Sequence, residues 1–324
     1  MSIRIGTASW ADKGLVDTGR FYPRHVNTPA ARLRYYATQF PLVEIDTSFY
    51  SIPTQQAARQ WAERTPEDFV MNIKAFRLFT GHQTSPAVLP AEVREALPQV
   101  LKLKSMLYFH EMPGELLDAL WAHFTDALEP LQQAGRLGLV HFQFPPWLLR
   151  NRAGHAHVAH CVERMEHCKI SVEFRNISWL DAEHARETMI FQRTLGVVHT
   201  IVDEPQGFTN SVPAVWETSV DDHALIRMHG RNSMTWNDTS NLSSGRFNYD
   251  YDEAELEGLA RQIQRLDERG LKIDVVLNNN AEDQAQRNGL SLMKLMSEIG
   301  ANVRMPSTKP PQSGQDDWIT TAAA

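Results

Sequence analysis

The stretch LVEIDTSFY at residues 42–50 alternates apolar and polar side chains. In an extended chain, Glu44, Asp46 and Ser48 fall on one face, and the residues between them fall on the other. A parallel strand that is covered by helices normally reads as a continuous apolar run. The alternation therefore indicates a strand that packs one face against helices and points a second, polar face elsewhere.

Short apolar runs of this kind alternate with segments of helical periodicity along the whole chain. The eight expected strands are Ile3–Ala8, Leu42–Thr47, Phe69–Ala75, Leu137–Phe144, Ile170–Phe174, Val197–Val202, Leu225–Met228 and Ile273–Leu277. Strands that alternate with helices form parallel βαβ units, and eight such units favour a closed barrel. We therefore predict one α/β domain, a (β/α)8 barrel of the TIM type, over residues 1–305. The polar, aperiodic tail at 306–324 is expected to be disordered.

The composition fits a folded protein with a large core, since 42% of the 324 residues are hydrophobic and 22% are charged. The formal net charge of −7 opposes non-specific binding to nucleic-acid phosphates, although a local basic pocket for a small anion or for nucleic acid stays open. Only two cysteines are present, and the sequence shows neither a signal peptide nor a long apolar run. These features predict a cytoplasmic protein without a membrane partner. The sequence carries no indication of an oligomeric state.

Polar residues recur near the C-terminal ends of the other expected strands. They are Asn72 and Lys74, His141 and Gln143, Ser171, Glu173 and Arg175, Asp203, Arg227 and His229, and Asn278 and Asn279. The helix-facing side of a barrel strand must be apolar, so these side chains are expected inside the barrel. Barrel enzymes carry their catalytic groups at the C-terminal ends of the strands. We therefore predict that the polar residues form one site at that mouth.

The segments that carry these residues resemble the YecE-like family, also called domain of unknown function 72. The matching segments are IGTASW (5–10), FYP (21–23), RYYATQFPLVEIDTSFYSIP (34–53), WAERTPEDFVMNIKA (61–75), FQFPPW (142–147), EFRNISW (173–179), VDEP (202–205), IRMHGR (226–231), FNYDY (247–251) and NNNAEDQAQRNG (278–289). The resemblance covers almost the whole chain and implies a β/α barrel. It implies little about the reaction, because the family is named for its unknown function.

The chemistry of the polar residues favours an enzyme that acts on a small anionic, phosphorylated or carbohydrate-derived molecule. Arginine and lysine recognise carboxylates and phosphates, and Glu, His and Lys exchange protons. The expected catalytic residues are Glu44, Lys74, Glu173 and His229. The expected substrate-binding residues are Gln143, Arg175, Asp203, Arg227, Trp236, Tyr249, Asn278 and Asn279. A hydrolase, a lyase and an isomerase all fit this pattern.

Two alternatives stay open. A metal-dependent hydrolase or isomerase would use Glu44, Glu173, Asp203 and His229 as ligands, by fold-level analogy with sugar-isomerase and abasic-endonuclease barrels. We expect neither a metal nor a cofactor, because Arg175 would compete for the Glu173 carboxylate. In the second alternative, the charges form a buried ion network in a barrel that binds a ligand or nucleic acid without turnover. The roles of segments 86–113 and 230–251 also stay open.

Overall fold

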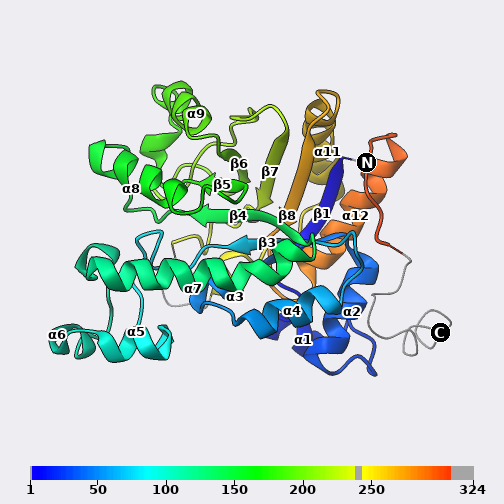
Figure 1. The fold of residues 1–324 in the computed structure, drawn as a ribbon. Coiled ribbons are helices and arrows are strands. Elements are labelled where there is room, and N and C mark those ends of the chain that lie inside the picture. The colour runs from blue at the N-terminus through cyan, green and yellow to red at the C-terminus, as the bar shows by residue number, and fades with distance from the viewer. Residues whose placement is uncertain (1, 238–242, 308–324) are drawn as a thin grey trace.

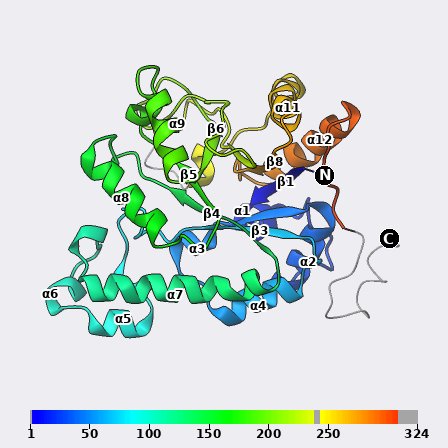
Figure 2. The same ribbon diagram turned by 45° about the horizontal axis from the view of Figure 1, so that its top comes forward.

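The computed structural model describes residues 2–237 and 243–307. The strands are β1 (Ile3–Ala8), β2 (Leu42–Ile45), β3 (Val70–Lys74), β4 (Leu137–Gln143), β5 (Ile170–Glu173), β6 (Val198–Asp203), β7 (His223–Met228) and β8 (Lys272–Leu277). Each strand pairs in parallel with the next one along the chain, and β8 pairs with β1. The eight strands therefore close into a barrel (Figures 1 and 2). The predicted (β/α)8 barrel is confirmed.

Helices connect the strands and cover the outside of the barrel (Figure 1). They are α1 (Lys13–Thr18), α2 (Pro29–Gln39), α3 (Thr47–Tyr50), α4 (Gln55–Glu63), α5 (Ala91–Ala96), α6 (Gln99–Lys102), α7 (Gly114–Gln133), α8 (Arg152–Glu163), α9 (Ala185–Thr194), α10 (Ser243–Arg246), α11 (Glu253–Asp267) and α12 (Gln284–Glu298). Polar side chains begin several of them by accepting otherwise unpaired backbone N–H groups. Thr28 accepts from Ala31 at the start of α2, and Asp252 and Glu255 form a capping box at the start of α11.

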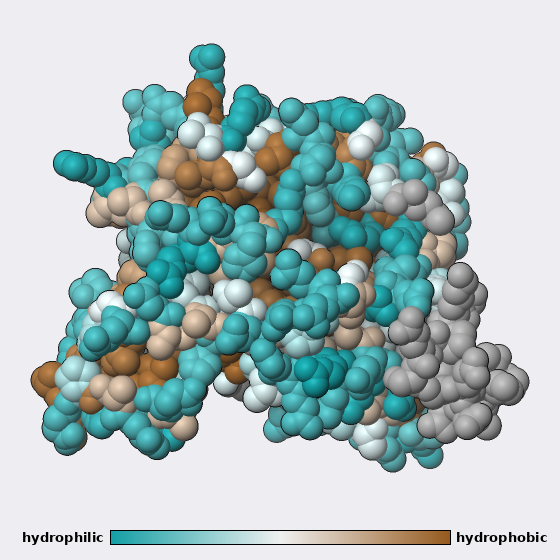
Figure 3. All heavy atoms as spheres, in the orientation of Figure 1, coloured by the Kyte–Doolittle hydropathy of each residue, from teal (hydrophilic) through white to brown (hydrophobic). Residues whose placement is uncertain are grey.

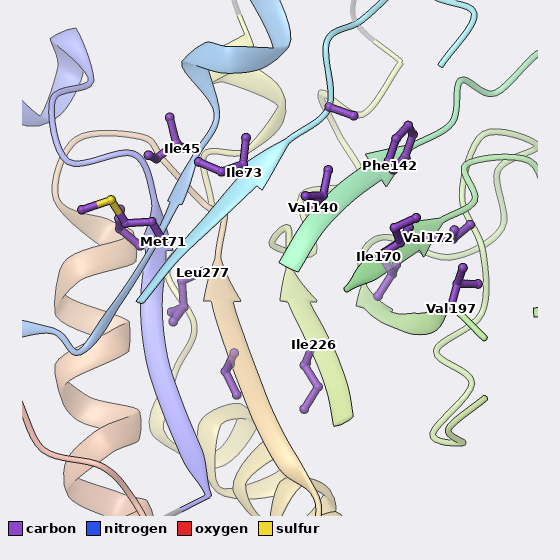
Figure 4. Close-up of a cluster of buried hydrophobic side chains, with 14 of the residues drawn as sticks. Ile45, Met71, Ile73, Val140, Phe142, Ile170, Val172, Val197, Ile226 and Leu277 are labelled. Atoms are coloured by element: carbon purple, nitrogen blue, oxygen red, sulfur yellow. The ribbon is translucent and has the colours of Figure 1, made fainter. Parts of the chain in front are cut away.

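Alternation along the strands separates two kinds of side chain across the barrel wall. Residues on the helix side belong to the main hydrophobic core, and Figure 4 labels members of it from Ile45 in β2 to Leu277 in β8. The strand positions between them point into the barrel. Part of this interior is apolar and forms a separate cluster, which includes Leu42, Val70, Leu139, Val198, Leu225 and Val276.

A buried polar group lies inside the barrel on its N-terminal side. The Asp274 carboxylate accepts from Arg4 Nε at 2.6 Å and from Asn72 Nδ2 at 3.2 Å, and it lies 3.3 Å from Nε2 of His223. Burial would raise the pKa of Asp274, but Arg4 and His223 hold it well below its usual value. Asn72 therefore belongs to this group, although the sequence places it on the same strand face as Lys74.

The segment after Glu44 differs from the expected strand. β2 ends at Ile45 and α3 begins at Thr47, so Ser48 does not share a strand face with Glu44. The Ser48 hydroxyl lies 2.6 Å from the Ile45 carbonyl oxygen and 2.7 Å from that of Lys74. A serine side chain that bonds nearby carbonyl groups offers the backbone an alternative to the sheet ladder. The bond to Ile45 favours a helical turn directly after β2, and the contact with Lys74 places this turn beside the end of β3.

The Pro-rich segment between β3 and β4 forms α5 and α6, which lie beyond α7 on the outside of the barrel (Figures 1 and 2). At its outer end Val100, Leu103 and Met106 are exposed, and apolar residues gather over α6 at the lower left of Figure 3. Within residues 2–237 and 243–307, no helix is long and apolar enough to cross a membrane. From residue 308 onward, the tail that was expected to be disordered lies outside the described residues.

Candidate functional site

A network of buried charges fills the C-terminal part of the barrel and centres on Arg227 of β7. The guanidinium group donates to both oxygens of Glu44, at 3.1 and 2.6 Å. It also donates to Oε2 of Glu173 at 2.7 Å and to Oε1 of Gln143 at 3.1 Å. The side chains of Arg227, Glu44 and Glu173 are fully buried. Carboxylates from β2 and β5 thus neutralise one arginine and fix its orientation.

Glu173 connects this arginine to a second arginine and to two histidines. Its Oε1 accepts from Arg175 Nη1 at 3.1 Å and lies 3.2 Å from His229 Nε2. Its Oε2 lies 3.3 Å from His141 Nε2. Burial would raise the pKa of Glu173, but Arg227 and the hydrogen bond of His229 hold it well below its usual value. Glu173 is therefore ionised and has partners on both oxygens.

His229 is a neutral part of the network. Burial lowers the pKa of His229 to about 3. Its Nδ1 lies 2.8 Å from Nδ2 of Asn278, an amide nitrogen that can only donate. Nδ1 is then the acceptor, and Nε2 carries the proton that faces Glu173. Both ring nitrogens of His229 therefore have protein partners.

Two cations lie at the mouth around the ring of Phe49. Nζ of Lys74 is 2.7 Å from Oδ1 of Asp46 and 4.4 Å from the ring centroid of Phe49. Burial would raise the pKa of Asp46, but Lys74 lowers it. Arg77 follows β3, and its Cζ is 5.4 Å from the Phe49 centroid and 5.7 Å from that of Tyr50. In the described part of the chain Arg77 has no carboxylate partner, and burial lowers its pKa.

Arg175 extends the network towards the end of β6. Besides Glu173, its Nη1 contacts Oε2 of Glu204 at 3.0 Å. Burial raises the pKa of Glu204 to about 7 although Arg175 acts against this rise. A cavity of about 530 Å³ is lined by Glu204 together with Asp203 and Pro205. The ring of Trp236 is fully buried and covers Arg175, with 5.0 Å between its centroid and Cζ.

A second carboxyl group with a raised pKa lies at the β1 side of the mouth. Burial, and then the charge of Asp46, raise the pKa of Asp12 to about 6. Just before it, Ser9 has a φ of 72°, in the left-handed region that residues other than glycine rarely adopt. Such strained positions persist where the surroundings fix them, and they cluster at functional sites.

Asp203, Asn279 and Tyr249 are predicted site residues that lie outside the Arg227 network. Asp203 points away from the barrel interior. On that outer side Arg231 binds it at 2.7 Å, and the Tyr251 hydroxyl donates to it at 2.6 Å. Asn279 donates to the carbonyl oxygen of Tyr249 at 2.8 Å. These contacts attach the segment after β7 to β6 and β8.

A profile of the family described as "Protein of unknown function DUF72" matches residues 4–314 of the chain. The protein belongs to this DUF72 family. It is 30% identical over 297 residues to the UPF0759 protein YunF of Bacillus subtilis (strain 168), which covers 91% of this chain and 94% of YunF. It is 29% identical over 132 residues to the UPF0759 protein YecE of Escherichia coli (strain K12), which covers 39% of this chain and 44% of YecE. The predicted family is confirmed.

Two solved structures of DUF72 proteins are similar to this barrel. A DUF72 family protein from Thermotoga maritima matches with a TM-score of 0.69 at 27% identity, over 92% of this chain and 100% of that one. A DUF72 family protein from Enterococcus faecalis matches with a TM-score of 0.73 at 23% identity, over 91% of this chain and 95% of that one. The second likeness concerns the fold alone.

The mouth of this DUF72 barrel also contains residues that the sequence reasoning missed. They are Asp12, Arg77, His82 and Glu204. The alternation of β6 could have identified Glu204, because Val198, Thr200 and Val202 point inward and Glu204 comes next. Arg77 and His82 lie in the irregular segment after β3, where no periodicity marks them.

The residues considered as metal ligands are distributed over two groups in this DUF72 structure. Glu44 and Glu173 bind Arg227, whereas Asp203 binds Arg231. Across residues 2–237 and 243–307, no group of three or more His, Cys, Asp and Glu side chains is arranged to hold a metal ion. The roles predicted from the sequence for individual site residues stay predictions.

Proposed function

We propose that this DUF72 protein is an enzyme that acts on a small anionic substrate, phosphorylated or carbohydrate-derived, by general acid/base catalysis at the C-terminal mouth of the barrel. The observation that carries the proposal is the environment of Arg77. Its guanidinium group is partly buried against Phe49 and Tyr50 and has no carboxylate partner among the described residues. Removing a charge from water is costly unless an opposite charge accompanies it, so this position favours an anion.

The distribution of charge supports an anion at this position. Glu44 and Glu173 lie deeper in the barrel and are occupied by Arg227. Lys74 and Arg77 lie further out, on the ring of Phe49. Asp46 pairs with Lys74, so within the described residues Arg77 keeps an uncompensated positive charge at this position. Such a local charge attracts an anion whatever the net charge of −7 on the chain.

Groups that exchange protons near neutral pH lie at the same mouth. Burial raises the pKa of Glu204 to about 7, and burial with the charge of Asp46 raises that of Asp12 to about 6. General acids and bases work best when their pKa is close to the working pH, and perturbed pKa values cluster at functional sites. We therefore assign proton transfer to Asp12 and Glu204. Glu44, Glu173 and His229 would position the arginines rather than meet the substrate.

Binding of inorganic sulfate tests this proposal. Isothermal titration calorimetry at low ionic strength should show sulfate binding to the wild-type protein. Arg77→Ala should weaken it by about ten-fold or more, because a charge-assisted contact is lost. The matched control is Arg261→Ala, which removes an exposed arginine paired with Glu257 on α11 and should bind sulfate like the wild type. Equal sulfate affinity of a folded Arg77→Ala variant and the wild type would overturn the proposal.

A further inference from the structure

His82 shares an aromatic wall with the cations of the proposed anion site. Its ring is edge-on to Phe49, with 5.0 Å between centroids, and edge-on to Trp147 at 5.4 Å. Lys74 and Arg77 approach the same Phe49 ring at 4.4 and 5.4 Å. His82 therefore lies beside the position at which an anion would bind.

The hydrogen bonds of Thr80 define the tautomer of His82. Oγ1 of Thr80 lies 3.1 Å from the carbonyl oxygen of Arg77 and 2.8 Å from Nδ1 of His82. The hydroxyl has one proton, and the carbonyl oxygen can only accept. Both contacts are hydrogen bonds together only when the hydroxyl donates to Arg77 and Nδ1–H donates to the hydroxyl. His82 then carries its proton on Nδ1 and a lone pair on Nε2.

Nε2 of His82 is available to a ligand. Within the described residues no hydrogen bond reaches this atom, and it is not among the buried side-chain atoms that lack a partner. It therefore reaches solvent. The corresponding atoms of His141 and His199 are sealed from solvent without a hydrogen bond, and both ring nitrogens of His229 are occupied.

Burial and the surrounding cations both lower the basicity of His82. Burial, and then the charges of Lys74, Arg77 and Arg175, lower the pKa of His82 to about 3. The ring of His82 is thus neutral at physiological pH and is a weak base in the protein without a bound anion. An anion among these cations would offset their charge, and an opposite charge nearby shifts a pKa by about 1–3 units. Two further titratable groups face the cations, Asp46 at Lys74 and Tyr50 at Arg77.

We propose that His82 is a further proton acceptor of this site, besides Asp12 and Glu204, and that a bound anion switches it on. The inference rests on the proposed function, because the anion is the partner that offsets the cations. It also narrows the substrate to a phosphate or carboxylate that carries a hydroxyl group. The anionic group would bind the cations, and the hydroxyl proton would move to Nε2, whose lone pair forms the new N–H bond. The electron pair of the broken O–H bond stays on the substrate oxygen, and Nδ1–H stays bound to Thr80.

Nitrogen NMR of histidine-labelled protein tests the tautomer and the switch. The signals of His82 are assigned with the variant His82→Asn, whose amide can still donate to Thr80. At about pH 5, where a histidine of ordinary pKa is charged, His82 should show a protonated Nδ1 and a bare Nε2. Saturating sulfate, which does not itself titrate in this range, should raise the pKa of His82 by about one unit or more.

The pH dependence of sulfate affinity gives a second measurement. If His82 had only a structural role, its replacement would not change this pH dependence. Because sulfate binding promotes protonation of His82, this residue should make the affinity of the wild type rise as the pH falls below about 5. His82→Asn should bind sulfate with a weaker pH dependence, the remainder coming from Asp12 and Glu204. The control is His123→Asn, at a surface histidine paired with Glu92, which should behave like the wild type.

The outcomes separate the two proposals. Sulfate binding that leaves the pKa of His82 unchanged, or a proton on Nε2 in the free protein, overturns the role of His82 and leaves the anion site standing. A wild-type protein that does not bind sulfate overturns both. An unchanged pH dependence in a folded His82→Asn variant likewise contradicts the inference.

Discussion

The guanidinium group of Arg227 donates to carboxylates from two strands and to the amide oxygen of Gln143. A buried ion pair of this kind adds little net stability, because desolvation offsets the attraction between the charges. Removing one partner is costly, however, because the remaining charge stays buried alone. Arg227 therefore contributes to the barrel mainly by compensating Glu44 and Glu173.

This role predicts the effect of Arg227→Met. The substitution should lower the free energy of unfolding by about 3–5 kcal/mol, since Glu44 and Glu173 lose their common partner. Urea denaturation followed by tryptophan fluorescence measures the change. Arg261→Met at the surface should change stability by less than about 0.5 kcal/mol. A loss as small as that of the control would mean that Arg227 is not needed to compensate the two carboxylates.

Single residues of the network could be predicted where they follow the two-residue period of a strand. Glu44, Glu173, Arg227 and His229 were found in this way, and the structure brings them together. At the end of β6 the same period selects Glu204, which points inward to Arg175, whereas Asp203 binds Arg231. Whether a buried arginine binds protein carboxylates or a ligand depends on distances between strands, which no local pattern contains.

At the scale of elements, the described parts of the segment between β7 and α11 are attached next to β7 and next to α11. Gly230 begins this segment with a φ of 84°, and its N–H group donates to the Tyr251 hydroxyl at 2.9 Å. Trp236 lies over Arg175 further along. The position of the tryptophan therefore depends on the turn at Gly230. The predicted substrate contact of Trp236 stays a prediction.

Gly230→Ala should disturb this segment. A Cβ atom at Gly230 would lie 2.5 Å from Cβ of Tyr249, and the positive φ is itself strained for alanine. We expect a loss of about 1–3 kcal/mol in stability and faster hydrogen exchange in the described residues near 230–237. The matched control is Gly258→Ala in α11, where nothing lies within 4 Å of the added Cβ. That change should stabilise the helix by about 0.5–1 kcal/mol. Equal effects of the two substitutions would contradict the role of Gly230.

Helices and strands could be predicted where buried side chains recur at a regular spacing along the sequence, and less well where they do not. The strands could be located because each must bury one face against helices. The short helices α5 and α6 could not, because they begin after Pro90 and Pro98 and show no long periodicity. At β2, the hydrogen bonds of Ser48 end the strand before the alternating pattern ends.

For the whole molecule, buried neutral histidines make stability depend on pH. Burial lowers the pKa of His82, His141, His157, His199 and His229 in the folded protein. The unfolded chain therefore binds more protons at these groups below about pH 6.5. Asp12 and Glu204 act in the opposite sense, because their pKa values are raised in the folded state.

We therefore expect the free energy of unfolding to fall between about pH 6.5 and pH 5. Five histidines outweigh two carboxyl groups, so the slope is at most about 4 kcal/mol per pH unit, from ~1.4 kcal/mol for each proton. Urea denaturation at a series of pH values measures it. Stability that stays constant or increases as the pH falls would show that these histidines are protonated in the folded protein.

The alternation at the end of β6 limits which insertions and deletions the coding sequence can accept. Asp203 and Glu204 are neighbours in the chain but lie on opposite sides of the barrel wall, one bound to Arg231 and the other to Arg175. A codon gained or lost within Val198–Asp203 would turn the wrong carboxylate inward and break both ion pairs at once. A point mutation in this strand leaves the direction of the other side chains unchanged, whereas an insertion or deletion reverses it. The segment 86–113 contributes no strand to the barrel, so we expect changes in length there to disturb the barrel wall less.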